Sequence, residues 1–388
     1  MELAIYGGKP TFTKKIPIQS QIGREELNAA VGVLKKGILS SSRKGFFVQQ
    51  FENEFARFLG VKYAVSTSSG TSALHTAVCA LNIKAGDEIL VPALTFVSSA
   101  SVILQERAKP VFVDVDPETF NLDTADLEKK ITTKTKAIIA VHLYGCPANI
   151  KEIIRIAEKH KLKVIEDCAQ AHGAKFFGKY VGLFGDIACF SFQQSKNMVC
   201  GEGGMVISNN KNLYKNCSAI IDHGLVDGNL QNYDYDRLGY NYHITDLQSA
   251  IGTQQLKKLK KMNERRRRNA NLYKKYLSDT ELFFQKELKD SQGVFYCLTA
   301  LLPERLKSKR DWFVDAVGAE NAEVNKLYPL ALTQTKLFFR NRQKDNCQVA
   351  ENIAGRLFNF CTSPMVDEKY IRKTSEAVKK VLNYLDKN

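Results

Sequence analysis

The chain has 388 residues, of which 44% are hydrophobic and 25% are charged, and its formal net charge at pH 7 is +15. Because a single hydrophobic core stops growing at about 250–300 residues, we expect two domains, or one large domain with a smaller appendage. No run of about 18 apolar residues is present, so we expect no membrane-spanning helix and no membrane partner. The N-terminal segment lacks the basic and long apolar regions of a signal peptide, and we expect none.

The cysteines favour a reducing compartment. There are nine, an odd number, and no two form a Cys-x-x-Cys pair. This argues against a disulfide framework and against a zinc site, and we expect a cytoplasmic protein without a bound metal.

The positive charge is densest between residues 257 and 268. Leu256, Leu259 and Met262 recur in and beside this basic run at helical spacing, so we interpret it as the solvated face of a helix. No nucleic-acid-binding motif accompanies it, and we expect no nucleic-acid partner. A surplus of lysine and arginine also suits phosphorylated ligands.

Helices are expected over residues 24–36 and 48–59, each followed by a glycine. Between residues 61 and 208 short β-branched runs alternate with helical patterns, which is typical of a mainly parallel sheet covered by helices on both faces. Ligands on such sheets bind beyond the carboxyl ends of the strands. Strands are expected at 63–65, 88–91, 111–113, 137–141, 163–167, 187–190 and 205–207, and helices from residues 72, 97, 124 and 150.

The last third of the chain predicts a separate, smaller unit. A long basic helix is expected over residues 250–276 and a closing helix over 374–385. We therefore divide the chain into a large domain, residues 1–249, and a linking helix with a small C-terminal α/β domain, residues 250–388.

A phosphate-binding turn is predicted after the first strand. Ser69, Gly70, Thr71 and Ser72 lead from this strand into a helix, where free backbone N–H groups and the positive helix end favour an anion. The Gly-Lys-Ser/Thr ending of a Walker loop is absent. The alternative is an ordinary N-cap by Ser69 or Thr71.

A carboxylate is predicted at the end of a buried strand. Asp167 closes the apolar run at residues 163–167, and a buried carboxylate is costly unless it pairs with a cation. That cation would come from a ligand or from the protein, and the alternatives are a helix N-cap or a structural ion pair. His172, five residues later, is interpreted as a hydrogen-bonded core histidine.

A lysine follows another strand. Lys196 comes after the apolar run 187–190 and before the glycine-rich residues 201–204. A lysine whose charged form is disfavoured can form an imine with a carbonyl compound, although on this segment alone it reads as a surface lysine before a turn. A phosphate cradle, a carboxylate and such a lysine together describe a site for pyridoxal phosphate, in which the carboxylate keeps the pyridine ring protonated.

Eight motifs occur in one order over residues 1–276, and in them the chain resembles the DegT/DnrJ/EryC1/StrS family of sugar aminotransferases. They lie at residues 7–10, 69–74, 91–96, 141–145, 166–173, 190–196, 201–204 and 239–242. The resemblance implies an α/β fold, the fold type I of pyridoxal-phosphate-dependent transferases: a large domain with a mainly parallel seven-stranded sheet between helices, and a smaller C-terminal α/β domain.

The resemblance also implies roles for individual residues. Lys196 would form the imine with the cofactor aldehyde and carry the proton between the substrate carbon and the cofactor, and Asp167 would contact the pyridine nitrogen. Gln170 would lie near the ring hydroxyl and Phe96 would stack on the ring.

The remaining implied contacts concern the cofactor phosphate. The turn at Gly70, the backbone amides of Thr71 and Ser72, and the Ser191 hydroxyl would hold it. Asn241 would reach the phosphate of the neighbouring subunit's cofactor, which implies a homodimer with shared active sites.

The implied reaction transfers an amino group from glutamate or glutamine to a nucleotide-linked keto sugar, for surface polysaccharide or natural-product biosynthesis. A keto-cyclitol aminotransferase, an aminohydroxybenzoate-forming enzyme and a non-catalytic pyridoxal-phosphate-binding regulator stay open. Lys196 disfavours the family's dehydratase branch, which has histidine there. His243 stands where many members have an arginine, and residues 329–331 depart from the family's Pro-Leu-His pattern, so donor and acceptor contacts do not follow from the resemblance.

Overall fold

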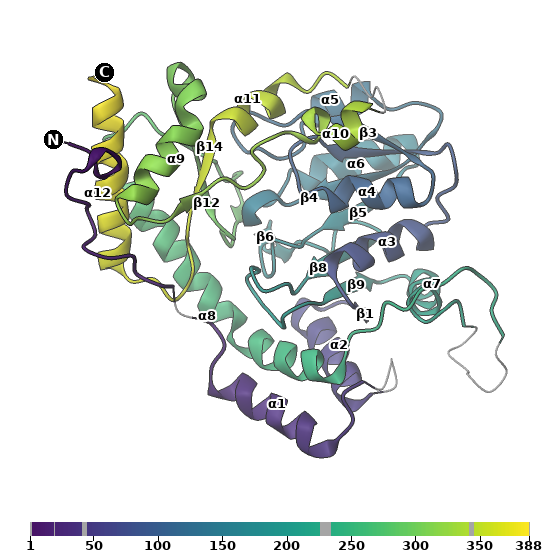
Figure 1. Ribbon diagram of the computed structural model, residues 1–388. Coiled ribbons are helices and arrows are strands. Elements are labelled where there is room, and N and C mark those ends of the chain that lie inside the picture. Colours follow the sequence, from purple (N-terminus) through teal and green to yellow (C-terminus); the bar gives the residue numbers. More distant parts are fainter. Residues whose placement is uncertain (1, 19, 41–44, 226–233, 341–344, 388) are drawn as a thin grey trace.

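A seven-stranded sheet forms the centre of the large domain in the computed structural model, which describes residues 2–18, 20–40, 45–225, 234–340 and 345–387 (Figure 1). The strand order is β1-β9-β8-β5-β4-β2-β3, and only β9 runs against its neighbours. This confirms the predicted mainly parallel sheet. Its strands are β1 (Tyr63–Thr67), β2 (Glu88–Pro92), β3 (Lys109–Val113), β4 (Thr135–Val141), β5 (Lys163–Asp167), β8 (Ile187–Ser191) and β9 (Gly204–Ser208).

Two layers of helices cover the sheet, which is why its strands are apolar on both faces (Figure 1). On one face pack α3 (Gly70–Ala80), α4 (Ser98–Gln105) and α7 (Lys211–Ile221). On the other pack α2 (Phe46–Leu59), α5 (Thr124–Lys129), α6 (Ile150–His160) and α8 (Asp246–Tyr276).

The register of the central strands brings their carboxyl ends together. Val141 of β4 pairs with Asp167 of β5, and Asp167 pairs with Cys189 of β8. The segment that leaves β8 therefore begins beside Asp167.

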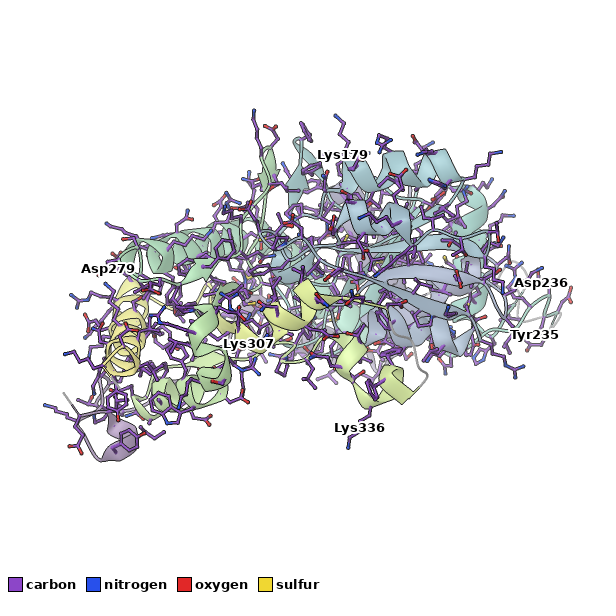
Figure 2. The ribbon with its side chains drawn as sticks, turned by 90° about the horizontal axis from the view of Figure 1, so that it is seen from above. Lys179, Tyr235, Asp236, Asp279, Lys307 and Lys336 are labelled. Carbon is purple, nitrogen blue, oxygen red and sulfur yellow. The ribbon has the colours of Figure 1, made fainter. Side chains whose placement is uncertain are left out.

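The small domain is a four-stranded antiparallel sheet, ordered β10-β12-β14-β13, which packs against the second half of α8. Its elements are β10 (Phe283–Phe284), β12 (Leu298–Leu301), β13 (Val324–Asn325), β14 (Leu357–Phe360), α9 (Arg310–Ala319) and α12 (Glu368–Leu385). Asp279, just after α8, forms an ion pair with Lys379 of α12 at 2.7 Å, and Figure 2 shows Asp279 beside that helix.

The segment around residues 3–12 lies on the small domain, although the large domain follows it in sequence. Leu3 and Phe12 belong to the apolar core of the small domain. The Glu320 carboxylate accepts hydrogen bonds from the N–H groups of Ala4 and Thr11, at 2.9 and 2.8 Å, and Lys380 of α12 donates to the same carboxylate.

The remaining elements are short or peripheral. They are η1 (Ala4–Tyr6), α1 (Arg24–Lys36), η3 (Leu143–Gly145), β6 (Lys175–Phe176), β7 (Lys179–Tyr180), β11 (Ser291–Gln292), η5 (Glu304–Lys309), η6 (Leu332–Gln334), α10 (Lys336–Arg340) and α11 (Gln348–Arg356). Within the described residues, no helix has the length and apolar character to cross a membrane.

The predicted helices are confirmed, with shifts at their ends. α1 spans the predicted residues and ends at Gly37, which has a left-handed backbone with φ 73°. α12 begins at Glu368, six residues before the predicted start, because Asp367 caps it by accepting from the Tyr370 N–H at 2.7 Å.

Candidate active site

Asp167 and Lys196 lie at the carboxyl ends of two neighbouring strands, as predicted. Asp167 is the last residue of β5, and Lys196 follows β8 by five positions. The two charges act on each other: the ammonium of Lys196 favours the ionised form of Asp167, and the carboxylate favours the charged form of Lys196. The fold therefore brings together the two residues to which the resemblance assigns catalysis.

The Asp167 carboxylate is buried without a cation beside it. It accepts hydrogen bonds from the Ser99 hydroxyl at 2.8 Å and from the Ala169 N–H at 3.1 Å. No lysine, arginine or histidine nitrogen of the described chain lies within 4.0 Å of it, so it forms no structural ion pair there. Burial raises its pKa, and the two hydrogen bonds only partly oppose this effect. A protonated pyridine nitrogen would supply the missing cation, so the residue fits pyridoxal phosphate.

Lys196 is half-buried in a loop whose two preceding residues, Gln194 and Ser195, are exposed. The backbone N–H of Lys196 donates to the Gln193 carbonyl at 2.8 Å, and the side-chain amide of Gln21 donates to the Lys196 carbonyl at 3.2 Å. Burial lowers the pKa of the amine more strongly than Asp167 raises it, and the nitrogen lies 4.9 Å from the centre of the Tyr296 ring. A lysine with a lowered pKa is neutral for a larger share of the time, which is the form that attacks a carbonyl carbon.

Lys196 lines a pocket of about 510 Å³ between the two domains. Its walls come from the loop before α1, the loop after β8, α8 and the small domain. The charged and polar residues that line it are Ser20, Gln21, Gln194, Ser195, Lys196, Arg266, Tyr296, Glu323, Asn325 and Ser363. A space of this size suits a small-molecule ligand.

The start of α3 touches the end of β8 at Gly70. A Cβ atom at Gly70 would lie 2.6 Å from the Cβ of Ser191, so no other residue fits there. Among the described residues, no acceptor is found for the N–H groups of Gly70 and Thr71. Two open donors at a helix N-terminus, beside a serine hydroxyl, fit a phosphate group.

The Ser69 cap that we considered as the alternative is also present. The Ser72 N–H donates to the Ser69 hydroxyl at 3.0 Å, and the Ser69 N–H donates to the Ser72 hydroxyl at 2.9 Å. The predicted phosphate donor at Ser72 is thus already engaged inside this capping box. The Thr71 hydroxyl hydrogen-bonds that of Ser98 at 2.7 Å and joins α3 to α4.

Gln170 and Phe96 both lie beside Tyr328. The Gln170 amide donates to the Tyr328 hydroxyl at 2.7 Å and accepts from the Tyr144 N–H at 2.7 Å. Tyr144 and Tyr328 stack with ring centres 5.8 Å apart. Phe96 is 52% exposed and 6.3 Å from the Tyr328 ring, so one face of Phe96 is free for another ring.

Asn241 lies outside the pocket that contains Lys196. Its side chain is exposed and accepts a long hydrogen bond from the His243 N–H, at 3.5 Å. The next residue, Tyr242, accepts from the Ser68 N–H at 2.7 Å, which places this segment behind the phosphate-binding turn. The structure does not bring Asn241 to Lys196 within one chain, and its predicted role concerns a second subunit.

His172 is a core residue, as we interpreted it, but the expected hydrogen bond is absent: among the described residues neither ring nitrogen has a partner. Its ring packs against Phe190 and Phe192, with centres 5.4 and 5.7 Å apart. Burial, and then the nearby charge of Lys196, lower its pKa to about 3, so the ring is neutral.

Three residues at the site did not emerge from the sequence. Ser99 binds Asp167 from α4, Tyr296 faces Lys196 from the small domain, and Arg266 lines the pocket from α8. Arg266 had a signal: it lies four residues after Met262 and seven after Leu259, on the apolar stripe of its helix. Assigning the whole basic run to the solvated face was therefore wrong for this residue, whereas Lys257, Lys260, Lys261, Arg265 and Arg268 are exposed.

Comparison with known proteins agrees with this site. Residues 20–379 match the model of the DegT/DnrJ/EryC1/StrS aminotransferase family. The chain is 38% identical to the GDP-perosamine synthase of Escherichia coli O157:H7 over 337 residues, 87% of this chain and 90% of that one. It is 38% identical to the L-glutamine:2-deoxy-scyllo-inosose aminotransferase of Streptomyces paromomycinus over 315 residues, 78% and 74% of the two chains.

A solved structure extends the likeness to the fold. S. venezuelae DesV, in complex with a ketimine intermediate, matches 95% of this chain and 98% of its own with a TM-score of 0.88 and 28% identity. The chain therefore belongs to the DegT/DnrJ/EryC1/StrS aminotransferase family, enzymes of fold type I that depend on pyridoxal phosphate.

Proposed function

We propose that this enzyme transfers an amino group from glutamate or glutamine to a nucleotide-linked keto sugar, and that the product serves surface polysaccharide or natural-product biosynthesis in the cytoplasm. One observation carries the proposal: the buried carboxylate of Asp167 has no cation within 4.0 Å among the described residues, and its charge interacts with Lys196, an amine of lowered pKa that lines a ligand-sized pocket. Such a pair suits a pyridine ring whose aldehyde the lysine holds.

The two residues would have different tasks. With pyridoxal phosphate bound, Asp167 would keep the ring nitrogen protonated, and the ring would supply an electron sink for the bond to be broken. Lys196 would hold the cofactor aldehyde as a nucleophile and, once freed, would serve as the base that moves a proton from the substrate carbon to the cofactor C4′.

Other residues position the cofactor in this proposal. The N–H groups of Gly70 and Thr71 and the Ser191 hydroxyl hold the phosphate, and Phe96 stacks on the ring. The Ser72 N–H contributes only by sharing its hydrogen bond with Ser69.

Gln170 positions the cofactor ring indirectly. Its hydrogen bonds with Tyr144 and Tyr328 fix the amide, which in this proposal would lie near the ring hydroxyl. Asn241 would act across a dimer interface.

The acceptor class is supported by relatives and by charge. The name of the E. coli relative refers to a sugar carried on a nucleotide, and the net charge of +15 favours acceptors that carry a diphosphate. A keto-cyclitol is the second candidate, because the Streptomyces relative named for such a substrate has the same 38% identity over 78% of the chain.

The test is absorption spectroscopy followed by an acceptor panel. With added pyridoxal phosphate, the protein should show a visible band that moves to the near ultraviolet on addition of glutamate or glutamine. The converted enzyme is then offered a nucleotide-linked keto sugar and a keto-cyclitol. Return of the visible band with the sugar alone supports the proposal, return with the cyclitol alone selects the second candidate, and return with neither rejects both.

A further inference from the structure

Arg266 differs from the three arginines around it. Arg265 and Arg268 are exposed, and Arg268 pairs with Glu368 at 3.0 Å. Arg267 donates to the Gly293 carbonyl at 2.6 Å and lies 3.5 Å from Glu287. Arg266 alone of the four is buried, with 5% of its surface exposed.

The buried guanidinium lacks an anion. No carboxylate of the described chain lies within 4.0 Å of it, its two hydrogen bonds to the Tyr296 carbonyl and the Gln21 side chain are both 3.5 Å long, and its Nε has no acceptor. Burial lowers its pKa to about 10, which leaves the group charged at neutral pH. A buried charge without a counter-ion is costly, so the position of Arg266 indicates a binding site for an anionic group of a ligand.

Arg266 lines the pocket in which the proposed reaction takes place. Arg266 and Lys196 line the same pocket and contact the same residue, Tyr296, one at its carbonyl and the other at its ring. Glu323 also lines this pocket. When Lys196 is neutral during the reaction, the charges of Arg266 and Glu323 cancel in the lining of this pocket. The carboxylate of Glu323 repels a diphosphate more strongly than it repels a single carboxylate, because the diphosphate carries more negative charge.

We propose that Arg266 binds a carboxylate of the amino donor, and this rests on the proposed use of glutamate or glutamine. The carboxylates of an amino acid lie only a few bonds from the reacting nitrogen, whereas a nucleotide diphosphate is separated from the reacting carbon by part of the sugar ring. The planar guanidinium can offer a carboxylate two parallel hydrogen bonds, which a lysine cannot.

The test compares Arg266→Gln and Arg266→Lys with Arg265→Gln, an exposed neighbour on the same helix. Each protein is loaded with pyridoxal phosphate, the donor concentration for half-conversion of the visible band is measured, and calorimetry gives the Kd of 2-oxoglutarate. Both constants should rise about 10- to 150-fold in Arg266→Gln, the effect of one charged hydrogen-bonding group, with a smaller rise in Arg266→Lys and none in Arg265→Gln. Unchanged constants in folded Arg266 variants would overturn the proposal.

Donor analogues and nucleotides distinguish the sources of the anion. Isoglutamine keeps only the side-chain carboxylate and glutamine only the α-carboxylate, so the analogue whose binding becomes insensitive to Arg266→Gln lacks the group that Arg266 holds. If the variants instead weaken GDP or UDP binding and leave the amino acids unaffected, the anion is the acceptor's diphosphate and the proposal is wrong.

Folding and function are checked separately. Melting temperature and retained cofactor establish that each variant is folded, and Arg266→Lys keeps the buried charge if Arg266→Gln does not fold. If the wild-type protein binds 2-oxoglutarate through Arg266 but never converts with an amino acid, the proposed function fails while the anion site stands. If it converts and Arg266 has no effect, only the anion site fails.

Discussion

At the scale of single residues, the pKa values of Asp167 and Lys196 are shifted in opposite directions for one reason. Burial disfavours charge, so it raises the pKa of the acid and lowers that of the amine. A cationic ligand beside Asp167 would stabilise its ionised form, and a carbonyl ligand would react with the neutral amine of Lys196; the protein alone supplies neither group. The site is therefore costly to the cofactor-free fold, and this cost can be measured.

Asp167→Asn should stabilise the protein without cofactor. Because burial raises the pKa of Asp167 above its ordinary value, ionising this carboxyl destabilises the folded state. The free energy of unfolding should rise in the variant by on the order of 1 kcal/mol, most fully at pH values above the folded pKa, and the gain should vanish below the unfolded pKa. Chemical denaturation of wild type and variant from about pH 3 to 8 gives this difference.

The control for this prediction is Asp279→Asn, because Asp279 is exposed and Lys379 holds its pKa low. This variant should show no gain in stability at any pH. With cofactor present the order should reverse at Asp167, since the wild-type carboxylate then has a cation. An Asp167→Asn protein that is less stable than wild type without cofactor would contradict the argument.

Lys196→Ala should abolish turnover while leaving cofactor binding measurable. Removing one positioned acid–base group costs about 10²–10⁴-fold, and loss of the imine adds to this. Cofactor should remain through phosphate and Asp167 contacts but should be removed by dialysis. Lys179, an exposed lysine at the edge of the large domain in Figure 2, is the control, and Lys179→Ala should keep wild-type turnover. Near-normal activity in Lys196→Ala would mean that another lysine holds the aldehyde.

At the scale of elements, the close approach of α3 to β8 shapes the turn that is predicted to bind the phosphate. Gly70→Ala would place a methyl group 2.6 Å from the Ser191 Cβ, which either pushes α3 away or shifts β8. Overpacking of this kind costs about 1–3 kcal/mol, and the same displacement should weaken cofactor binding. Thermal unfolding and a cofactor titration measure the two effects.

Two further variants make the Gly70 prediction specific. Gly32 lies inside α1 with open space around it, so Gly32→Ala should be neutral or stabilising by up to about 1 kcal/mol. Adding Ser191→Gly to Gly70→Ala should recover stability, though not the hydroxyl contact. If Gly70→Ala binds cofactor normally, the helix start is not the phosphate site.

The helices and strands could be predicted from the sequence because the hydrophobic periodicity of each one is set by its own neighbouring residues. Strand and helix periodicity located the seven strands, and strand ends marked Asp167 and Lys196. Partners such as Tyr296, which is 100 positions from Lys196 along the chain, depend on how the domains pack. The prediction for Arg266 was wrong for a different reason. Its spacing places it on the apolar stripe of the helix, but we assigned it to the solvated face because it is charged.

At the scale of the whole molecule, Asn241 gives the predicted dimer a sharp test. Its side chain is exposed and does not line the pocket that contains Lys196 in its own chain, and its predicted contact is with the cofactor of a second subunit. Mixing Lys196→Ala with Asn241→Ala subunits should create heterodimers with one intact site. Random exchange makes half of the dimers heterodimers, so activity at limiting cofactor should recover to about one quarter of wild type.

The control mixes Lys196→Ala with Gln170→Ala. Gln170 lies in the same chain as the tyrosines it binds, so both changes damage sites without offering a partner residue in trans. In that mixture the one subunit that keeps Lys196 also carries the Gln170 change, and activity should not exceed that of Gln170→Ala alone. Equal recovery in both mixtures would argue against shared sites.

The packing of residues 3–12 on the small domain has a consequence for biosynthesis. Ala4 meets Glu320 across 316 positions of sequence, and Lys380 of α12 completes the same cluster. On the ribosome, residues 3–12 emerge long before their binding surface exists, while the large domain can already assemble. The small domain, and with it the wall that carries Glu323, is therefore finished after the large domain, so the pocket that contains Lys196 is complete only when α12 has been synthesised.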